Sequence, residues 1–122
     1  MTTEKKILTR DEILTASDYE TKVVEIPEWG GSVRLRTMTG KARDEFEAEV
    51  SSKTIGGNVD VRGIKAYLLS RVIVDEKDEL MFTPEDVEAL NSKAAGPLNS
   101  LFEIASRMNG IGEKAAQSTE KN

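Results

Sequence analysis

The stretch from Leu80 to Met108 reads LMFTPEDVEALNSKAAGPLNSLFEIASRM and carries the strongest helix signals of this 122-residue chain. Thr83 can accept a hydrogen bond from the free amides at a helix start, and Pro84 suits the first helical position. Acidic residues follow, where the helix dipole is positive. Apolar residues then recur at intervals of three and four on both sides of a small-residue joint at 94–97. They are Val87, Leu90, Leu98, Leu101, Phe102, Ala105 and Met108. We therefore predict two helices whose apolar stripes form the core.

Three segments upstream carry further helix signals. Thr9 and Glu12 fit a capping box, which predicts a short helix with Ile13 and Leu14 on its inner side. Thr39 precedes a second helix, over 40–50, that docks by a narrow apolar stripe. A third helix is predicted over 61–72, fully buried on one face, with Gly63 inside it costing about 1 kcal/mol relative to alanine. The two stripes consist of Ala42, Phe46 and Val50, and of Val61, Ile64, Leu68 and Val72.

Residues 21–26 and 32–37 are rich in β-branched side chains that partly alternate with polar ones, and Pro27 to Gly31 separate them. This pattern predicts a β-hairpin. In its second strand Val33 and Leu35 are expected on the core face, with Arg34 and Arg36 on a wet face. Glu25 is expected to pair across the strands with one of the two arginines.

Two segments are expected to be irregular. Residues 51–58 form a loop around Gly56-Gly57, which lacks the lysine and hydroxyl residue of a phosphate-binding loop. Residues 73–82 form an acidic turn from which Leu80 and Phe82 return to the core. Its acids do not follow the calcium-loop pattern, because the sixth residue from Asp75 is leucine instead of glycine.

These elements predict an α+β fold: a small, mainly helical domain of four to five helices with an N-terminal β-hairpin. We expect a flexible N-terminus over 1–7, one domain over 8–111, and a disordered tail over 112–122, where no large apolar side chain occurs.

Composition excludes several classes of function. The chain has neither cysteine nor histidine, so no catalytic, cofactor or metal site is expected. It has no apolar run long enough to span a bilayer and no secretion signal, which indicates a cytosolic protein. Seven of its acids fall within 75–88 against one lysine, and no basic stripe suited to nucleic acid occurs elsewhere. The acidic cluster leaves a nucleic-acid mimic as a minor alternative.

An ordered series of short motifs resembles the tail assembly chaperones of long-tailed bacteriophages and prophages. The similarity runs from about Leu8 to Gly110. Its motifs are PEWGGSVRLR (27–36), TG (39–40), RDEFE (43–47), VDE (74–76), LMFTPEDVEAL (80–90), LF (101–102) and MNG (108–110).

The resemblance implies a non-enzymatic chaperone in the host cytoplasm that binds the tape-measure protein, keeps it soluble while the tail tube forms, and is absent from the mature virion. It also implies self-association and a longer form, made by ribosomal frameshifting, that recruits the tail-tube protein. The present chain resembles the short form, and its ending Glu120-Lys121-Asn122 can be encoded by a slippery A-AAA-AAC run. The alternative is a permanent tail or head-tail connector component.

Trp29, Met81 and Phe82 are the candidate partner-binding residues. Trp29, the only tryptophan, either covers the end of the core or anchors a partner, since tryptophan is enriched at interface hot spots. Phe82 is likewise either a core residue or part of a groove for an amphipathic helix.

Overall fold

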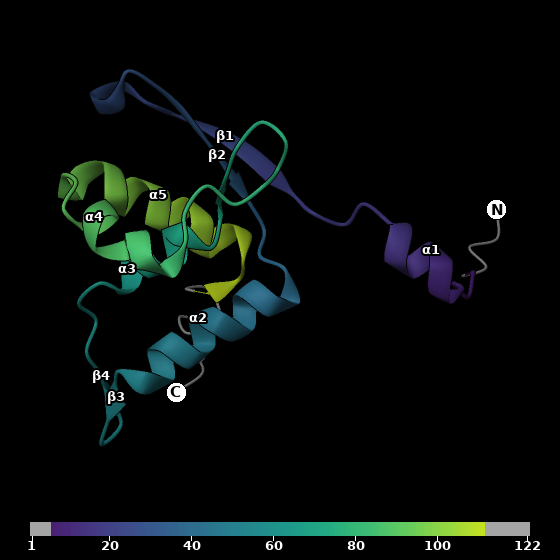
Figure 1. The fold of residues 1–122 in the computed structure, drawn as a ribbon, viewed down its shortest axis with the longest axis horizontal. Coiled ribbons are helices and arrows are strands. Elements are labelled where there is room, and N and C mark those ends of the chain that lie inside the picture. The colour runs from purple at the N-terminus through teal and green to yellow at the C-terminus, as the bar shows by residue number, and fades with distance from the viewer. Residues whose placement is uncertain (1–5, 112–122) are drawn as a thin grey trace, which may run out of the picture.

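A computed structural model describes residues 6–111. Most of the expected flexible N-terminus and the whole expected tail, 112–122, lie outside this range. Within it the predicted α+β class is confirmed, with five α-helices and an antiparallel sheet (Figure 1). Each of the described helices is too short or too polar to cross a membrane.

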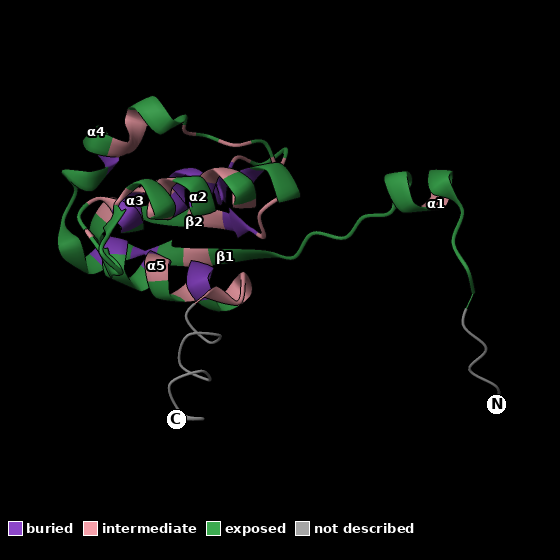
Figure 2. Cartoon of the chain, turned by 90° about the horizontal axis from the view of Figure 1, so that it is seen from below, coloured by how far each residue is buried: buried purple, intermediate pink, exposed green. Residues whose placement is uncertain are grey.

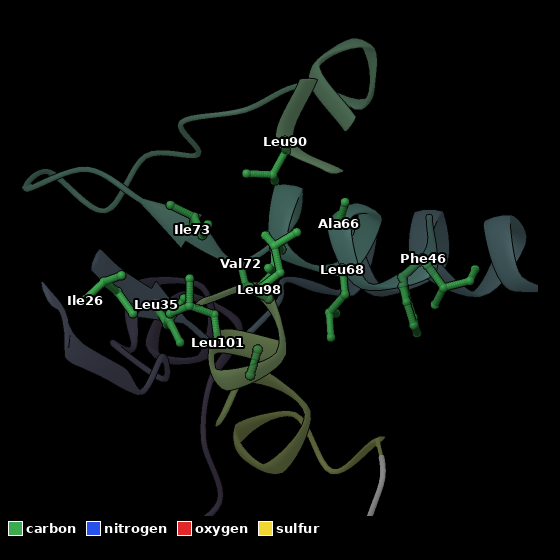
Figure 3. Packing of buried hydrophobic residues seen from close by; sticks show 13 residues of the cluster. Ile26, Leu35, Phe46, Ala66, Leu68, Val72, Ile73, Leu90, Leu98 and Leu101 are labelled. Atoms are coloured by element: carbon green, nitrogen blue, oxygen red, sulfur yellow. The ribbon is translucent and has the colours of Figure 1, made fainter. Parts of the chain in front are cut away.

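The centre of the body is α3 (Ile64–Ser70), which contacts α2 (Gly40–Ser52), α4 (Val87–Asn91) and α5 (Ala95–Met108). Its Ala66, Leu68 and Leu69 are fully buried, and the adjoining Val72 is as well. Leu98 and Leu101 of α5 pack beside them, whereas α4 buries only Leu90 (Figure 3). The core thus contains the predicted stripes of α3 and α5, but α3 instead of the two later helices is at its centre, and Leu90 is the one buried residue of α4.

α3 is shorter than the predicted helix over 61–72. Gly63 precedes it with φ +79°, a left-handed conformation that glycine adopts without strain, so Gly63 imposes no cost inside the helix. Val61 lies outside the helix and is 70% exposed, contrary to its predicted burial.

The predicted hairpin is confirmed as β1 (Thr21–Ile26) and β2 (Gly31–Arg36), joined by the short 3₁₀ helix η1 (Pro27–Trp29). A third strand, β5 (Ile73–Val74), pairs with the other edge of β2. Leu80 bridges back to Val74, so the segment expected to be only a turn also extends the sheet.

The prediction that Arg34 and Arg36 lie on a solvent-exposed face of β2 is wrong. Arg36 is buried and Arg34 is half-buried, because the acidic turn folds over them. Asp78 accepts hydrogen bonds from both: its carboxylate from Arg34 Nε at 2.7 Å and its carbonyl from Arg36 Nη1 at 2.6 Å. Arg34 thus takes Asp78 as its ionic partner instead of the expected Glu25.

The predicted loop over 51–58 contains a two-stranded ribbon, β3 (Thr54–Ile55) and β4 (Asn58–Val59). Gly56 and Gly57 connect its strands with φ of +59° and +84°. Two consecutive left-handed residues are the geometry of a tight hairpin turn, which the Gly-Gly pair permits.

The N-terminal helix α1 (Arg10–Thr15) has the predicted capping box: Glu12 N donates to Thr9 Oγ1, and Thr9 N donates to a Glu12 carboxylate oxygen. It does not pack on the body, from which it stands apart at the end of an extended linker (Figures 1 and 2). The predicted inner face is therefore wrong, since Ile13 and Leu14 are 57% and 65% exposed.

A candidate partner-binding groove

Two of the three candidate residues, Trp29 and Phe82, line one surface groove with a volume of about 300 Å³. Ala89 and Leu90 of α4 complete its apolar wall, and Asp86 and Lys93 are its charged members. We call it the Trp29–Phe82 groove. It lies where the tip of the β1–β2 hairpin meets the segment that leads into α4.

The hairpin tip places Trp29. Ile26 ends β1 inside the core, and Pro27 begins η1 with a φ suited to a helical turn. Gly30 follows in the left-handed conformation and donates its N–H to the Pro27 carbonyl at 3.0 Å. This reversal leaves the Trp29 indole half-buried, packed on the core cluster on one side and lining the groove on the other.

Arg71 holds the Phe82 segment in place. Its Nη2 donates to the Phe82 carbonyl at 2.7 Å, and its Nη1 forms an ion pair with Glu45 of α2 at 3.0 Å. The Arg71 side chain is only 7% exposed, so these bonds form in a region largely shielded from water. One buried guanidinium therefore ties the groove wall to α2.

Met81 lies outside the groove. Its N–H donates to the Ile73 carbonyl at 3.1 Å, which keeps the backbone here in a strand-like path. Successive side chains of an extended chain point to opposite sides, so Phe82 turns inward while Met81 remains 55% exposed. The structure therefore brings Trp29 and Phe82 together in one groove and leaves the Met81 side chain outside it.

A second capping box positions the α4 wall. Thr83 N donates to Asp86 Oδ2 at 2.8 Å, and the 3₁₀ turn η2 (Pro84–Asp86) leads directly into α4. Asp86, Ala89, Leu90 and Lys93 are spaced at three, four and seven, which places them on one helix face. That spacing is the sequence signal that could have identified the groove wall in advance.

The acidic turn is structured by its own carboxylates. The Asp75 carboxylate accepts the backbone N–H groups of Lys77 and Glu79 at 2.8 and 3.0 Å. The hydrogen bond from Arg34 holds the pKa of Asp78 below its usual value. Among residues 6–111, no three acidic side chains converge as metal ligands.

The lining of the groove is mainly apolar. Asp86 and Lys93 are its only ionisable members, and the remaining lining is aromatic and aliphatic carbon. A groove with such a wall receives apolar side chains from a helix that presents them at spacings of three and four.

Comparisons with known proteins agree with the motif resemblance. The family model described as phage tail assembly chaperone matches residues 9–122. Among solved structures, the tail assembly chaperone of bacteriophage HK97 is similar with a TM-score of 0.57 and 22% sequence identity, over 80% of this chain and 90% of that one. This likeness shows a shared fold. A search of curated protein sequences finds no match.

Proposed function

Because this chain belongs to the phage tail assembly chaperone family, we propose that its Trp29–Phe82 groove binds the tape-measure protein and keeps it soluble while the tail tube assembles. The observation that carries this proposal is the groove itself, an apolar concavity with an aromatic residue from each of two separate segments. Tryptophan and other large aromatics dominate binding energy at protein interfaces.

The size of the groove fits a helical client bound by many copies. An engineered apolar cavity of about 150 Å³ holds one benzene-sized ligand. By that measure a groove of about 300 Å³ holds roughly two branched or aromatic side chains. A long amphipathic helix offers such pairs at each turn or two, and many modest contacts along it add to a strong total through avidity.

The wider role follows from the same family. We propose that the chain acts without catalysis in the host cytoplasm, leaves before the virion is complete, and self-associates. We further propose that a longer form, produced by frameshifting near the end of the gene, joins it and recruits the tail-tube protein. A gene lacking a slippery run near codons 120–122 would contradict the frameshifting step.

Co-expression with the tape-measure protein tests the central proposal, with soluble client as the readout. Ala89→Glu places a charged side chain in the groove at an exposed α4 position. Ala48→Glu makes the same change at an exposed position of α2, outside the groove, and is the matched control. We expect the wild type and Ala48→Glu to keep the client soluble and Ala89→Glu to lose at least about tenfold in client affinity.

Two results would overturn the proposal. One is a client that remains insoluble with the wild-type chain. The other is equal client binding by Ala89→Glu and Ala48→Glu, which would place the contact elsewhere. Stoichiometric copies of this chain in purified virions would instead support a permanent structural component.

A further inference from the structure

The charged groups around the Trp29–Phe82 groove are mostly carboxylates. Asp86 lies in its lining, and each of three glutamates is next in sequence to a lining residue. These glutamates are Glu28 on η1, Glu85 on η2 and Glu88 on α4. We call the four residues the acidic rim. Their charge bears on which apolar helix the groove accepts.

The negative charge of the rim is not neutralised by the described part of the chain. Its three glutamates are exposed and form no ion pair with any residue there. Asp86 accepts hydrogen bonds from the N–H and the hydroxyl of Thr83, which are neutral donors. The rim therefore offers negative charge at four positions to the cations of a partner.

Basic groups beside the groove do not offset this charge. Arg71, which donates to the Phe82 carbonyl, is buried and forms its ion pair with Glu45. Among the described lining residues only Lys93 is basic, and it lies at the other end of the α4 wall from Asp86. One lysine against four carboxylates leaves the surroundings of the groove net negative.

The rim acts on any helix that occupies the groove. Residues adjacent in the chain have Cα atoms about 3.8 Å apart, and charges act over about 8 Å at physiological ionic strength. α4 lies at the edge of the body and is largely exposed (Figure 2), so a helix that packs against it brings its own charges within this range. Basic side chains on that helix are attracted, and acidic ones are repelled.

We propose that the Trp29–Phe82 groove selects an amphipathic helix with lysine or arginine on both sides of its apolar stripe. The apolar side chains fill the groove, and the basic ones meet the acidic rim. Lysine and arginine suit this position because their aliphatic stems cover apolar surface while their charged ends reach outward. The proposal rests on the proposed function and narrows it, since it states which tape-measure segments are bound.

Trp29 provides a direct readout of groove occupancy. It is the only tryptophan of the chain and lines the groove, so its fluorescence should respond when a tryptophan-free peptide binds there. Three synthetic helices serve as probes, with the same leucine stripe and with lysine, glutamine or glutamate on its borders. We expect the full chain to bind the lysine peptide about tenfold more tightly than the glutamate peptide at low salt, with the glutamine peptide between them.

Salt and rim variants identify the cause of this preference. In about 1 M NaCl charges are screened beyond about 3 Å, so the three peptides should bind alike. Glu85→Gln/Glu88→Gln removes two rim charges at exposed positions and should reduce the preference for lysine to about threefold at low salt. Asp11→Asn/Glu103→Gln removes two exposed charges on α1 and α5, outside the rim, and should keep the full preference.

Charge selection is overturned by any of four results. They are a peptide series that leaves Trp29 fluorescence unchanged, equal binding of the lysine and glutamate peptides at low salt, a preference that persists in about 1 M NaCl, and an equal loss of preference in the rim variant and its control. Tighter binding of the glutamate peptide would also overturn it and would make an acidic helix the occupant.

The proposed function is scored separately, on the full tape-measure protein. A client that remains insoluble refutes that function, while the peptide preference still decides charge selection. A client that is kept soluble supports the function even where the peptides show no preference and charge selection fails.

Discussion

Arg71 is the residue on which the groove wall depends most. Replacing it with alanine leaves the Phe82 carbonyl and the Glu45 carboxylate without their shared donor. Removing one member of a buried ion pair costs about 3–5 kcal/mol. Because Glu45 is about one-third exposed, we expect the free energy of unfolding to fall by about 2–3 kcal/mol, measured by urea denaturation.

Arg62→Ala is the control for this experiment. The Arg62 side chain is 88% exposed and forms an ion pair with nearby Asp60, so we expect the urea midpoint to remain unchanged. An Arg71→Ala chain with the wild-type midpoint would show that Phe82 is held by packing alone.

Asp78 makes stability depend on pH. Its folded-state pKa is lowered, chiefly by the hydrogen bond from Arg34, so the unfolded chain binds the proton more readily. The stabilisation that ionised Asp78 gives the folded chain is therefore complete above the usual aspartate pKa of about 4. It is lost as the pH falls through the lower pKa of the folded state. We expect Asp78→Asn to lose less stability than the wild type on acidification below pH of about 4.

Urea midpoints measured at neutral and acidic pH give this comparison. Asparagine is the suitable replacement because residue 78 has φ +65°, which Asn tolerates better than most residues. Parallel pH profiles for the two chains would show that the Arg34–Asp78 pair adds nothing to stability.

Among the elements, the β3–β4 ribbon depends on its glycines. Gly57 has φ +84°, so Gly57→Ala is strained and should open the ribbon, raising amide exchange at Ile55 and Asn58 by about tenfold. The α3 amides should be unaffected. Gly96, the second residue of α5, has open space around it and no positive φ, so the same change there should leave the β3–β4 ribbon closed. Equal effects at the two sites would exclude a backbone cause.

Elements with local signals were predictable from sequence. The capping box at Thr9, the helix caps at Thr39 and Thr83 and the β1–β2 hairpin all depend on residues within a few positions of one another. The β3–β4 ribbon was predicted as a loop because its strands have only two residues each, too few to show alternation, although the Gly-Gly pair between them is a hairpin signal.

Features formed by residues distant in the chain were not predictable in this way. β5 has two residues and forms only by pairing with β2 and with the segment at Leu80. The burial of Arg36 depends on the Asp78 carbonyl, and the groove depends on η1 meeting the start of α4. The residue types of Trp29 and Phe82 were enough to suggest them as partner-binding residues. Their proximity, and the position of Met81 outside the groove, depend on the tertiary structure.

At the scale of the whole molecule, the described chain divides into a packed body and a projecting arm that contains α1. The sequence patterns did not predict this division. Ile13 and Leu14 are adjacent apolar residues of a short capped helix, and this signal does not say whether any surface covers them. In the structure, the arm residues bury nothing and the body buries its own core without them. The apolar side chains of the arm therefore contribute nothing to the packing of the body.

This division predicts that a chain beginning at Ser17 folds as stably as the full chain. Had α1 packed on the body, removing Ile13 and Leu14 would cost about 3 kcal/mol or more. Because both are exposed, we expect thermal midpoints equal within about 2 °C. The comparison is made in dilute solution, where association adds no stability. A truncated chain that melts well below the full one when dilute would show instead that α1 returns to its own body.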